Sequence, residues 1–164
     1  SIVCDFNDYK EDIDFFAISI GPGSFTSLRI SLSFVKGFTF GLDSKIIPVP
    51  TLESLNFSVK DQGEHYIVVD SYRDKCFIQK FDGLKIANEP YIDSISSLAN
   101  IKSEIYGYSE SVQNSHKIVP SSILIGQYAI KNSSNLIQKN KIDDISPIYL
   151  SASKYVKIND IGSK

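Results

Sequence analysis

One junction constrains the fold of this chain more than any other feature. Residues 14–20 (DFFAISI) form a nearly continuous apolar run that stops at Gly21, Pro22 and Gly23, and a long periodic segment follows at residues 26–42. A short apolar run of this kind is typical of a central α/β strand that is buried on both faces. The periodic segment has helical spacing. The junction therefore predicts a strand, a glycine turn and a helix in direct succession.

The predicted helix has two apolar sides. One side consists of Leu28, Leu32, Val35 and Leu42. The other side mixes large apolar residues with small ones, namely Ser27, Ile30, Ser31, Phe34, Gly37, Phe38 and Gly41. Only a narrow strip is polar, and it consists of Arg29, Ser33 and Lys36. Because a helix that covers one sheet needs a single apolar side, the second side predicts close packing against another helix.

The next elements keep the α/β order. Residues 45–49 (KIIPV) predict a strand in which Pro48 marks an edge position or a strand end. Thr51 is the predicted N-cap of a short helix that continues to about Val59, with Glu53 in its first turn. Strand, helix, strand and helix in this order are the signature of an α/β fold.

The second half begins with an antiparallel meander. Residues 65–71 and 75–81 predict two strands joined by a short turn. Asp82 and Gly83 are a strong hairpin signal before residues 84–87.

Beyond the meander, the pattern predicts two helices, a strand and an extended end. A weak helical pattern covers residues 93–99, and residues 104–108 predict a short strand. Ser121 and Ser122 are candidate caps of a helix that ends near residue 138. The apolar positions predicted for this helix are Ile123, Leu124, Tyr128, Ile130 and Ile137. Residues 147–150 predict an extended apolar anchor.

These elements divide the chain into three expected units. Residues 1–62 are the remainder of an N-terminal α/β lobe that carries the glycine turn and the long helix. Residues 63–150 form a C-terminal α/β lobe, since the meander begins near Gly63. Residues 151–164 are a loose tail.

The turn between strand and helix is a candidate anion site. Backbone N–H groups and the dipole at a helix N-terminus favour a negative charge in such a turn, which makes Gly21, Gly23 and Ser24 the candidate residues. The string is neither a Walker A loop nor a full GxGxxG, because Thr26 occupies the third glycine position. Ser24 also lacks the GxSxG frame of a nucleophile elbow. From the residues alone, a ligand-binding loop and a purely structural turn both stay open.

As a whole string, residues 21–42 (GPGSFTSLRISLSFVKGFTFGL), followed by IPVPTLESL, closely resemble the TsaB (YeaZ) family, whose usual form is GPGSFTGLRIG. Residues 68–73 with Cys76 and Phe77 resemble the strand–turn–strand of that family, and residues 147–150 (PIYL) resemble its C-terminal P-V-Y-L-R. The resemblance spans about residues 13–150. It implies the two-lobe α/β fold of the actin, sugar-kinase and Hsp70 group (the ASKHA or ribonuclease H-like fold), with the first lobe incomplete.

The resemblance implies a scaffold subunit without catalytic activity of its own and without a cofactor. TsaB proteins are relatives of the catalytic subunit TsaD that lack its catalytic machinery. They dimerise with TsaD and, with the ATPase TsaE, support threonylcarbamoyl transfer to the adenosine beside the anticodon of tRNA. The contact with TsaD uses the helix after the GPGSFT turn, so the second apolar side described above becomes the expected partner surface. A homodimer through residues 26–42 is a further expectation.

The chain departs from the family pattern in three places. Ser27 and Ser31 stand where the family has glycines, and each adds bulk at a close helix contact. Ser151 replaces the terminal arginine of P-V-Y-L-R. The sequence also starts after the first strands of the family, so we expect the hairpin that holds a phosphate in kinases of this fold to be absent and the first sheet to have an unpaired edge.

Composition narrows the remaining functions. The 17 Lys and Arg against 19 Asp and Glu give a net charge of −2, and Arg29 and Arg73 are the only arginines. This balance argues against direct nucleic-acid binding, so we expect tRNA contact only through the partner. Cys4 and Cys76 are too few for a disulfide framework. No apolar stretch is long enough to span a membrane and no secretory signal is present, which predicts a cytoplasmic protein.

Two other functions remain as alternatives. A nucleotide- or anion-binding module would use the glycine turn. An independent hydrolase or protease is less favoured, because His65 and His116 lack the HxxxH or HExxH spacing of a zinc site. Asp70, Arg73 and Asp74 predict a charged surface turn rather than an acid–base cluster.

Overall fold

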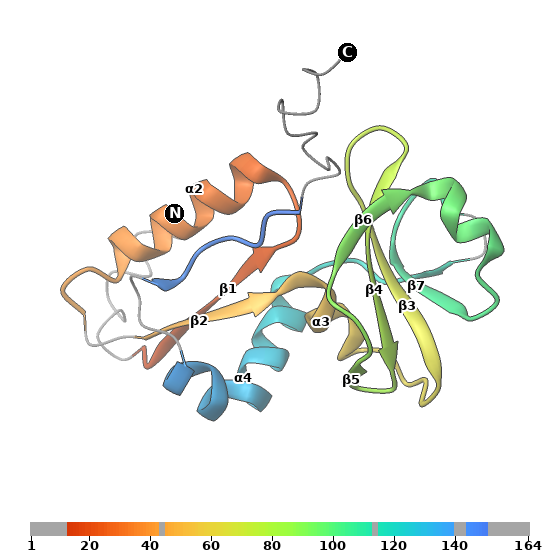
Figure 1. Cartoon of the computed structure of the whole chain (residues 1–164). Coiled ribbons are helices and arrows are strands. Elements are labelled where there is room, and N and C mark those ends of the chain that lie inside the picture. The colour runs from red at the N-terminus through yellow and green to blue at the C-terminus, as the bar shows by residue number, and fades with distance from the viewer. Residues whose placement is uncertain (1–12, 43–44, 113–114, 140–143, 151–164) are drawn as a thin grey trace, which may run out of the picture.

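The computed structural model describes residues 13–42, 45–112, 115–139 and 144–150, and only the backbone of residues 137–139 (Figure 1). In chain order the elements are β1 (Phe15–Gly21), α2 (Phe25–Phe38), β2 (Lys45–Pro50), α3 (Thr51–Asn56), β3 (Glu64–Asp70), β4 (Lys75–Asp82), β5 (Lys85–Ile86), β6 (Tyr91–Ser94), the 3-10 helix η2 (Ile95–Asn100), β7 (Glu104–Tyr108), β8 (His116–Lys117) and α4 (Ser122–Lys139). The mixed α/β class predicted from the sequence is confirmed. Cys4, Ser151, the side chain of Ile137 and the expected tail at residues 151–164 lie outside the described part of the chain.

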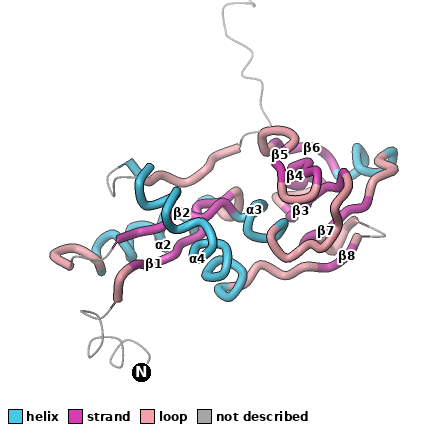
Figure 2. Tube along the Cα trace, turned by 90° about the horizontal axis from the view of Figure 1, so that it is seen from below, coloured by secondary structure: helices cyan, strands magenta, loops and turns pink. Residues whose placement is uncertain are grey.

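β1 and β2 form a parallel pair between two helices. Side chains alternate between the two faces of a strand, so Ile18 and Ile46 pack with Leu32 of α2 on one face. On the other face, Ile47 and Val49 pack with Ala129 of α4. Figure 1 shows α2 on one side of the pair and α4 on the other, and Figure 2 shows the same arrangement from below.

β1 is less buried than the sequence predicts. Only Ile18 and Gly21 of this strand are buried. Among the described residues, β2 is the single strand that pairs with β1. The predicted strand is therefore confirmed, and its side chains pack on both faces, with Ile18 toward α2 and Ala17 toward α4. Its predicted central position is wrong within the described residues, because one edge of β1 has no strand beside it there.

α2 begins and packs as its sequence pattern indicates but ends early. The Ser24 side chain caps the helix by accepting a hydrogen bond from the Ser27 backbone N–H at 3.4 Å. Leu28 and Leu32 are buried against β1, as predicted. The prediction that the helix continues to residue 42 is wrong. Thr39 is its C-cap, after which the Phe40 backbone N–H bonds to the Gly37 carbonyl oxygen at 3.3 Å and Gly41 leaves the helical conformation with φ +81°.

α3 is shorter than predicted, and its first residue has a different role. The N-cap position is Pro50, so the prediction of Thr51 as the N-cap is wrong. The Thr51 hydroxyl instead hydrogen-bonds the Ser19 hydroxyl at 2.8 Å and joins the helix to β1. Glu53 lies in the first turn, as predicted, and the helix ends at Asn56 rather than near Val59.

The second sheet confirms the predicted meander. β3 pairs with β4 and β4 pairs with β5, both antiparallel, with Gly83 in the β4–β5 turn. β7 joins the other edge of β3 in parallel, and β8 follows β7. Residues 91–94, partly expected as helix, form strand β6 on β4, and the helical turn that follows is η2.

Two apolar clusters cover the two faces of the second sheet. On one face, Ile67 and Phe81 pack against Leu52 and Leu55 of α3. On the other face, Val68 and Ile78 pack with Leu98 of η2. The second sheet is therefore enclosed on both faces by its own flanking segments.

The packed side of α4 agrees only in part with the predicted one, since Leu124 and Tyr128 pack inward as predicted. Ser121 caps it, as predicted, by accepting a hydrogen bond from the Leu124 backbone N–H at 3.3 Å. Ile123 and Ile130 were expected at buried positions, but they are 68% and 67% exposed. The buried side contains Ala129 instead, because the spacing of Ile125, Tyr128, Ala129 and Leu136 places these residues toward β2. In the part of the chain that the structure describes, no helix is long and apolar enough to cross a membrane.

The last described segment, residues 145–150, is extended and contacts both sheets. The Ile148 backbone N–H donates to the Ile20 carbonyl oxygen at 2.7 Å beside β1. Ile145 is buried with Ile18 in the first sheet, while Leu150 packs against the cluster on the second sheet. The predicted apolar anchor at residues 147–150 is thereby confirmed. We call residues 145–150 the strap.

Candidate functional site

The second apolar side of α2 lies on the surface. Ser27, Ile30, Ser31, Phe34 and Gly37 are all exposed, with Ile30 64% and Phe34 61% exposed. A Cβ added at Gly37 would meet no atom within 4 Å, so open space faces this position. We call the set Ser27, Ile30, Ser31, Phe34, Gly37 and Phe38 the outer face of α2.

Aromatic rings make one end of the outer face rigid. The Phe34 and Phe38 rings stack with centroids 5.8 Å apart, and Phe16 of β1 meets Phe38 edge-on at 5.7 Å. Phe38 is therefore half-buried and joins the surface of the helix to the sheet beneath it. Such aromatic pairs hold large apolar surfaces in place at small entropic cost.

Gly41, the last predicted partner residue, is not on the helix. α2 ends at Phe38, and Gly41 lies in the turn that follows, beside Phe40, which is 90% exposed. The sequence analysis missed Phe40 because it assigned this position to the helix. Phe40 is a further exposed apolar side chain, in the turn just after α2.

The glycine turn is closely packed against the strap. Gly21 has φ +101°, and a Cβ at this position would lie 2.8 Å from Leu28 Cδ1 and 3.2 Å from the Ile148 carbonyl oxygen. The Ser24 hydroxyl accepts hydrogen bonds from the Ser27 backbone N–H and from the Ser27 hydroxyl. Gly23 is half-buried. Gly21 and Ser24 thus have structural tasks in the turn, and anion binding there stays a prediction.

A cavity of about 570 Å³ opens beside the turn. Its lining comes from the turn and start of α2, the end of β3 with the following turn, β4 and the strap: Gly23, Ser24, Phe25, Asp70, Ser71, Tyr72, Phe77, Ile148, Tyr149 and Leu150. The Asp70 carboxylate accepts hydrogen bonds from the Ser109 hydroxyl at 2.5 Å and from the Glu110 backbone N–H at 3.0 Å. A carboxylate at the wall opposes binding of an anion in this cavity.

The polar strip of α2 has a role that the sequence analysis missed. Arg29 Nε donates to the Tyr149 hydroxyl at 2.9 Å, and Lys36 Nζ donates to the Ile145 carbonyl oxygen at 2.9 Å. The strip is therefore the side of the helix that holds the strap. Arg29 and Lys36 are seven residues apart, and this spacing places both cations on one side of the helix. Their role could not be predicted from it, because their hydrogen-bond partners lie more than 100 residues away in the sequence.

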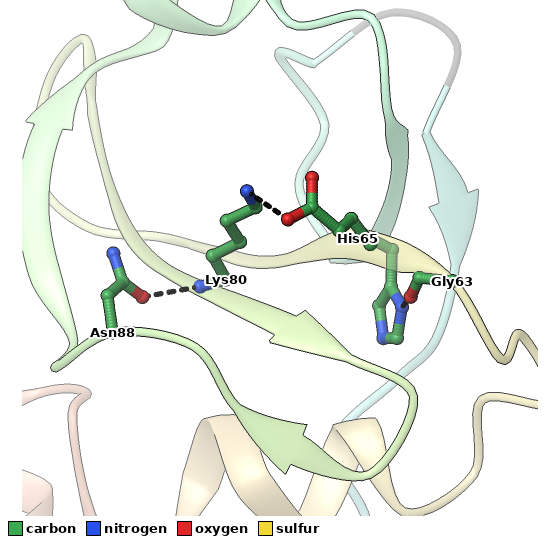
Figure 3. A network of polar contacts seen from close by, with 5 residues as sticks. Gly63, His65, Lys80 and Asn88 are labelled. Carbon is green, nitrogen blue, oxygen red and sulfur yellow. Dashed lines mark hydrogen bonds and ion pairs between the residues drawn. The ribbon is translucent and has the colours of Figure 1, made fainter.

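His65, a residue of the enzyme alternative, is a buried structural group. Its Nδ1 lies 2.9 Å from the Gly63 carbonyl oxygen and its Nε2 lies 2.6 Å from Asn56 Oδ1. Figure 3 shows the contact with Gly63 next to the polar contacts of Lys80 and Asn88. Because both ring nitrogens are engaged within the fold, His65 is not presented to a substrate.

The Tyr106 ring lies between the two histidines, with its centroid 5.5 Å from that of His65 and 4.8 Å from that of His116. His116 Nε2 lies 2.8 Å from Glu104 Oε2, and both side chains are exposed. Arg73 occupies the turn before β4 at φ +57°, next to Asp74. Within the described residues, no three His, Cys, Asp or Glu side chains are grouped as metal ligands.

Cys76 is shielded from reaction. It is fully buried in β4, and burial, with the carboxylates of Asp70 and Asp93 as smaller causes, raises the pKa of its thiol to about 12. A thiol with so high a pKa is a poor nucleophile and a poor metal ligand.

The chain is similar to proteins of one family. The family model described as "TsaD: tRNA N6-adenosine threonylcarbamoyltransferase" matches residues 4–161. No curated protein matches at a significant level.

Two similar solved structures come from Pseudomonas aeruginosa. One is an uncharacterized protein with similarity to peptidase YeaZ; it is 16% identical, with a TM-score of 0.70, over 92% of this chain and 81% of that one. The other is YeaZ, which is 18% identical, with a TM-score of 0.68, over 90% of this chain and 81% of that one. The two-lobe α/β fold implied by the sequence resemblance is thereby confirmed.

Proposed function

Since the chain belongs to the TsaD family and has the fold of its YeaZ (TsaB) relatives, we propose that it is a non-catalytic scaffold subunit that binds a TsaD-like catalytic subunit through the outer face of α2. In this role it supports threonylcarbamoyl transfer to the adenosine beside the anticodon of tRNA, together with a TsaE-like ATPase. It would act as a component of that complex in the cytoplasm and contact tRNA only indirectly.

The observation that carries the proposal is the exposure of the outer face. Ile30 and Phe34 are each more than 60% exposed in the chain alone, although both are large apolar residues. Exposed apolar residues next to each other mark surfaces that bind proteins or membranes. Small residues between them, Ser27 and Ser31, permit the close approach of a second helix, as the family pattern implies.

Several observations oppose catalysis by the chain itself. His65 is engaged by Gly63 and Asn56 inside the fold, and His116 is paired with Glu104 on the surface. The Asp70 carboxylate is hydrogen-bonded by the loop after β7. Each of these side chains is hydrogen-bonded to different partners within the fold, so they do not form an acid–base pair with one another.

The experiment is a binding and activity assay with a TsaD-like subunit. Ile30→Asp places a charge at the centre of the outer face and should weaken binding by about 3 kcal/mol or more, because a charge is then buried without a partner. The matched control is Ile130→Asp on α4, a residue of the same type, in a helix, with nearly the same exposure. The proposal predicts that Ile30→Asp abolishes co-elution with the TsaD-like subunit and threonylcarbamoyl transfer, whereas Ile130→Asp leaves both intact. Equal behaviour of the two variants would contradict it.

We also propose that a second copy of this chain binds the outer face of α2 when the TsaD-like subunit is absent, which forms a homodimer. Sedimentation of the chain alone, with and without Ile30→Asp, measures it. If dimerisation and TsaD binding use one face, the TsaD-like subunit should displace the second copy.

The alternative is a nucleotide-binding module that uses the glycine turn and the adjoining 570 Å³ cavity, although the Asp70 carboxylate at the wall of this cavity counts against it. Calorimetry with ATP and ADP tests it directly. Absence of heat at millimolar nucleotide would remove this alternative, and heat that is lost on mutation of Ser24 would support it.

A further inference from the structure

The strap connects the two sheets at the point where α2 begins. Ile145 is buried with Ile18 and Leu32 in the first sheet. Five residues later, Leu150 packs on the cluster of the second sheet, which includes Phe77. Figure 1 shows this blue segment running between α2 and β1 toward the glycine turn. The strap therefore joins α2, β1 and the second sheet.

α2 uses three separate sides. The buried side, with Leu28 and Leu32, rests on β1. The outer face points to solvent. The third side holds the strap, with Arg29 bonded to the Tyr149 hydroxyl near the start of the helix and Lys36 bonded to the Ile145 carbonyl oxygen near its end. The third side adds polar contacts near both ends of the helix to the apolar contacts of the buried side.

The contact at the start of the helix is a stacked cluster. The Phe25 and Tyr149 rings lie 5.0 Å apart, and the Arg29 guanidinium carbon lies 4.4 Å from the Phe25 ring centroid and 5.7 Å from that of Tyr149. Arg29 thus combines a hydrogen bond with cation–π contacts to two rings. The backbone behind this cluster is fixed by the bond from Ile148 N–H to the Ile20 carbonyl oxygen.

We propose that the strap sets the angle of α2 at which the outer face meets its partner, with Arg29 and Tyr149 as positioning residues. The inference rests on the proposed function, because it assigns a positioning device to the same surface. The apolar contacts of α2 with β1 are non-directional, whereas the hydrogen bonds at both ends of the third side have a defined direction and fix the angle of the helix. Binding then takes place with a helix that is already oriented, which lowers the entropic cost of association.

The test uses the full chain with Tyr149→Phe and Arg29→Ala. Tyr149→Phe keeps the ring stack and removes the hydroxyl that accepts from Arg29. The matched control is Tyr72→Phe, another half-exposed tyrosine that lines the same cavity. Hydrogen exchange of the α2 amides in the free chain measures how firmly the strap holds the helix. Affinity for the TsaD-like subunit measures whether the outer face is oriented for binding.

We expect Tyr149→Phe and Arg29→Ala to raise α2 amide exchange and to weaken partner binding by about 2–10-fold, as for the loss of one hydrogen bond. The melting temperature should change little, so a loss of affinity at constant stability separates positioning from a merely structural role. The proposal is overturned if α2 exchange is unchanged, or if exchange rises and affinity stays as in the wild type. If the wild-type chain does not bind a TsaD-like subunit, the proposed function fails and the positioning role fails with it.

Discussion

The two sheets of the molecule are stabilised in different ways. In the second sheet, Ile67, Ile78 and Phe81 are at most 1% exposed and are covered by α3, η2 and the neighbouring strands. In the first sheet, β1 has two buried residues, Ile18 and Gly21. Its cover consists of α2, which follows β1 directly, and of α4 and the strap, which come from the other end of the described chain.

This difference separates the residues that are explained by packing within the chain from those whose apolar side chains the fold leaves exposed. Residues in β3 and β4 are explained by contacts within the chain. On the first-sheet side, Ile30 and Phe34 have large apolar side chains that the fold itself leaves exposed. Substitutions in the second sheet should therefore lower stability, and substitutions on the outer face of α2 should change binding.

The largest effect is expected for Gly107→Ala in β7. Gly107 has φ +140°, and an added Cβ would lie 1.9 Å from the Val68 carbonyl oxygen on the paired strand β3. Backbone atoms of a central strand cannot give way, so we expect a loss of about 4 kcal/mol or more in the free energy of unfolding. Urea denaturation measures it.

Gly21→Ala makes the corresponding change in the first sheet. Its Cβ would meet Leu28 Cδ1 at 2.8 Å, and this atom is the end of a flexible side chain. The strap carbonyl oxygen of Ile148 lies at 3.2 Å, where a shift of about a few tenths of an ångström relieves the contact. We expect a smaller loss of about 2–3 kcal/mol, most of it from the backbone conformation. A larger loss in the free energy of unfolding for Gly21→Ala than for Gly107→Ala would contradict the difference between the two sheets.

His65→Phe should have the next largest effect. The ring stack on Phe81 is kept, but Asn56 Oδ1 loses its contact with His65 Nε2 in a buried place. The Gly63 carbonyl oxygen keeps the Gly83 backbone N–H as a donor at 3.1 Å. We expect a loss of about 1–3 kcal/mol, since one unsatisfied buried polar group is costly.

The control for His65→Phe is the neighbouring residue on β3. Glu64→Ala removes an ion pair with Lys80 on the exposed side of the same strand (Figure 3). Such a pair contributes about 0–1 kcal/mol. Similar losses in the free energy of unfolding for the two variants would show that burial does not determine the stability of the second sheet.

Alkaline pH gives a third comparison. Burial raises the pKa of the Cys76 thiol to about 12, whereas in the unfolded chain it titrates near 9.0. The unfolded state therefore loses this proton first, and the stability contributed by the thiol is complete below pH 9 and falls as the pH rises toward 12. Between pH 8.5 and 10.5 we expect the wild type to lose about 1–2 kcal/mol more than Cys76→Ala, measured by urea midpoints. Parallel pH profiles for the two proteins would contradict the prediction.

Local signals predicted the second sheet well. The hairpin at Asp82 and Gly83 and the strands before it depend on residues adjacent in the sequence, and they are confirmed. The start of α2 depends on Ser24 as a cap and on the period of Leu28 and Leu32, which are also local.

The first sheet shows where sequence reasoning fails. Ile123 and Ile130 have the same helical period as the buried residues of α4, so the period alone does not say which side faces β2. Thr51 has the chemistry of an N-cap, but it bonds to Ser19, which is 32 residues away. The sequence predicts the candidate surface from Ser27 to Gly41, whereas the strap contacts of Arg29 and Lys36 depend on residues more than 100 positions later.

The smallest effect, and the most selective, is expected for Gly37→Ala. Gly37 lies inside α2 and Gly126 inside α4, and an added Cβ meets nothing within 4 Å at either position. Alanine is a better helix former than glycine, so each variant should gain about 0.5–1 kcal/mol in the free energy of unfolding. Only Gly37→Ala should weaken binding to a TsaD-like subunit, because its methyl group enters the seam where a second helix approaches. A loss of binding for Gly126→Ala, or no loss for Gly37→Ala, would place the partner on another surface. The comparison is direct because both glycines have open space around them and differ only in the helix face on which they lie.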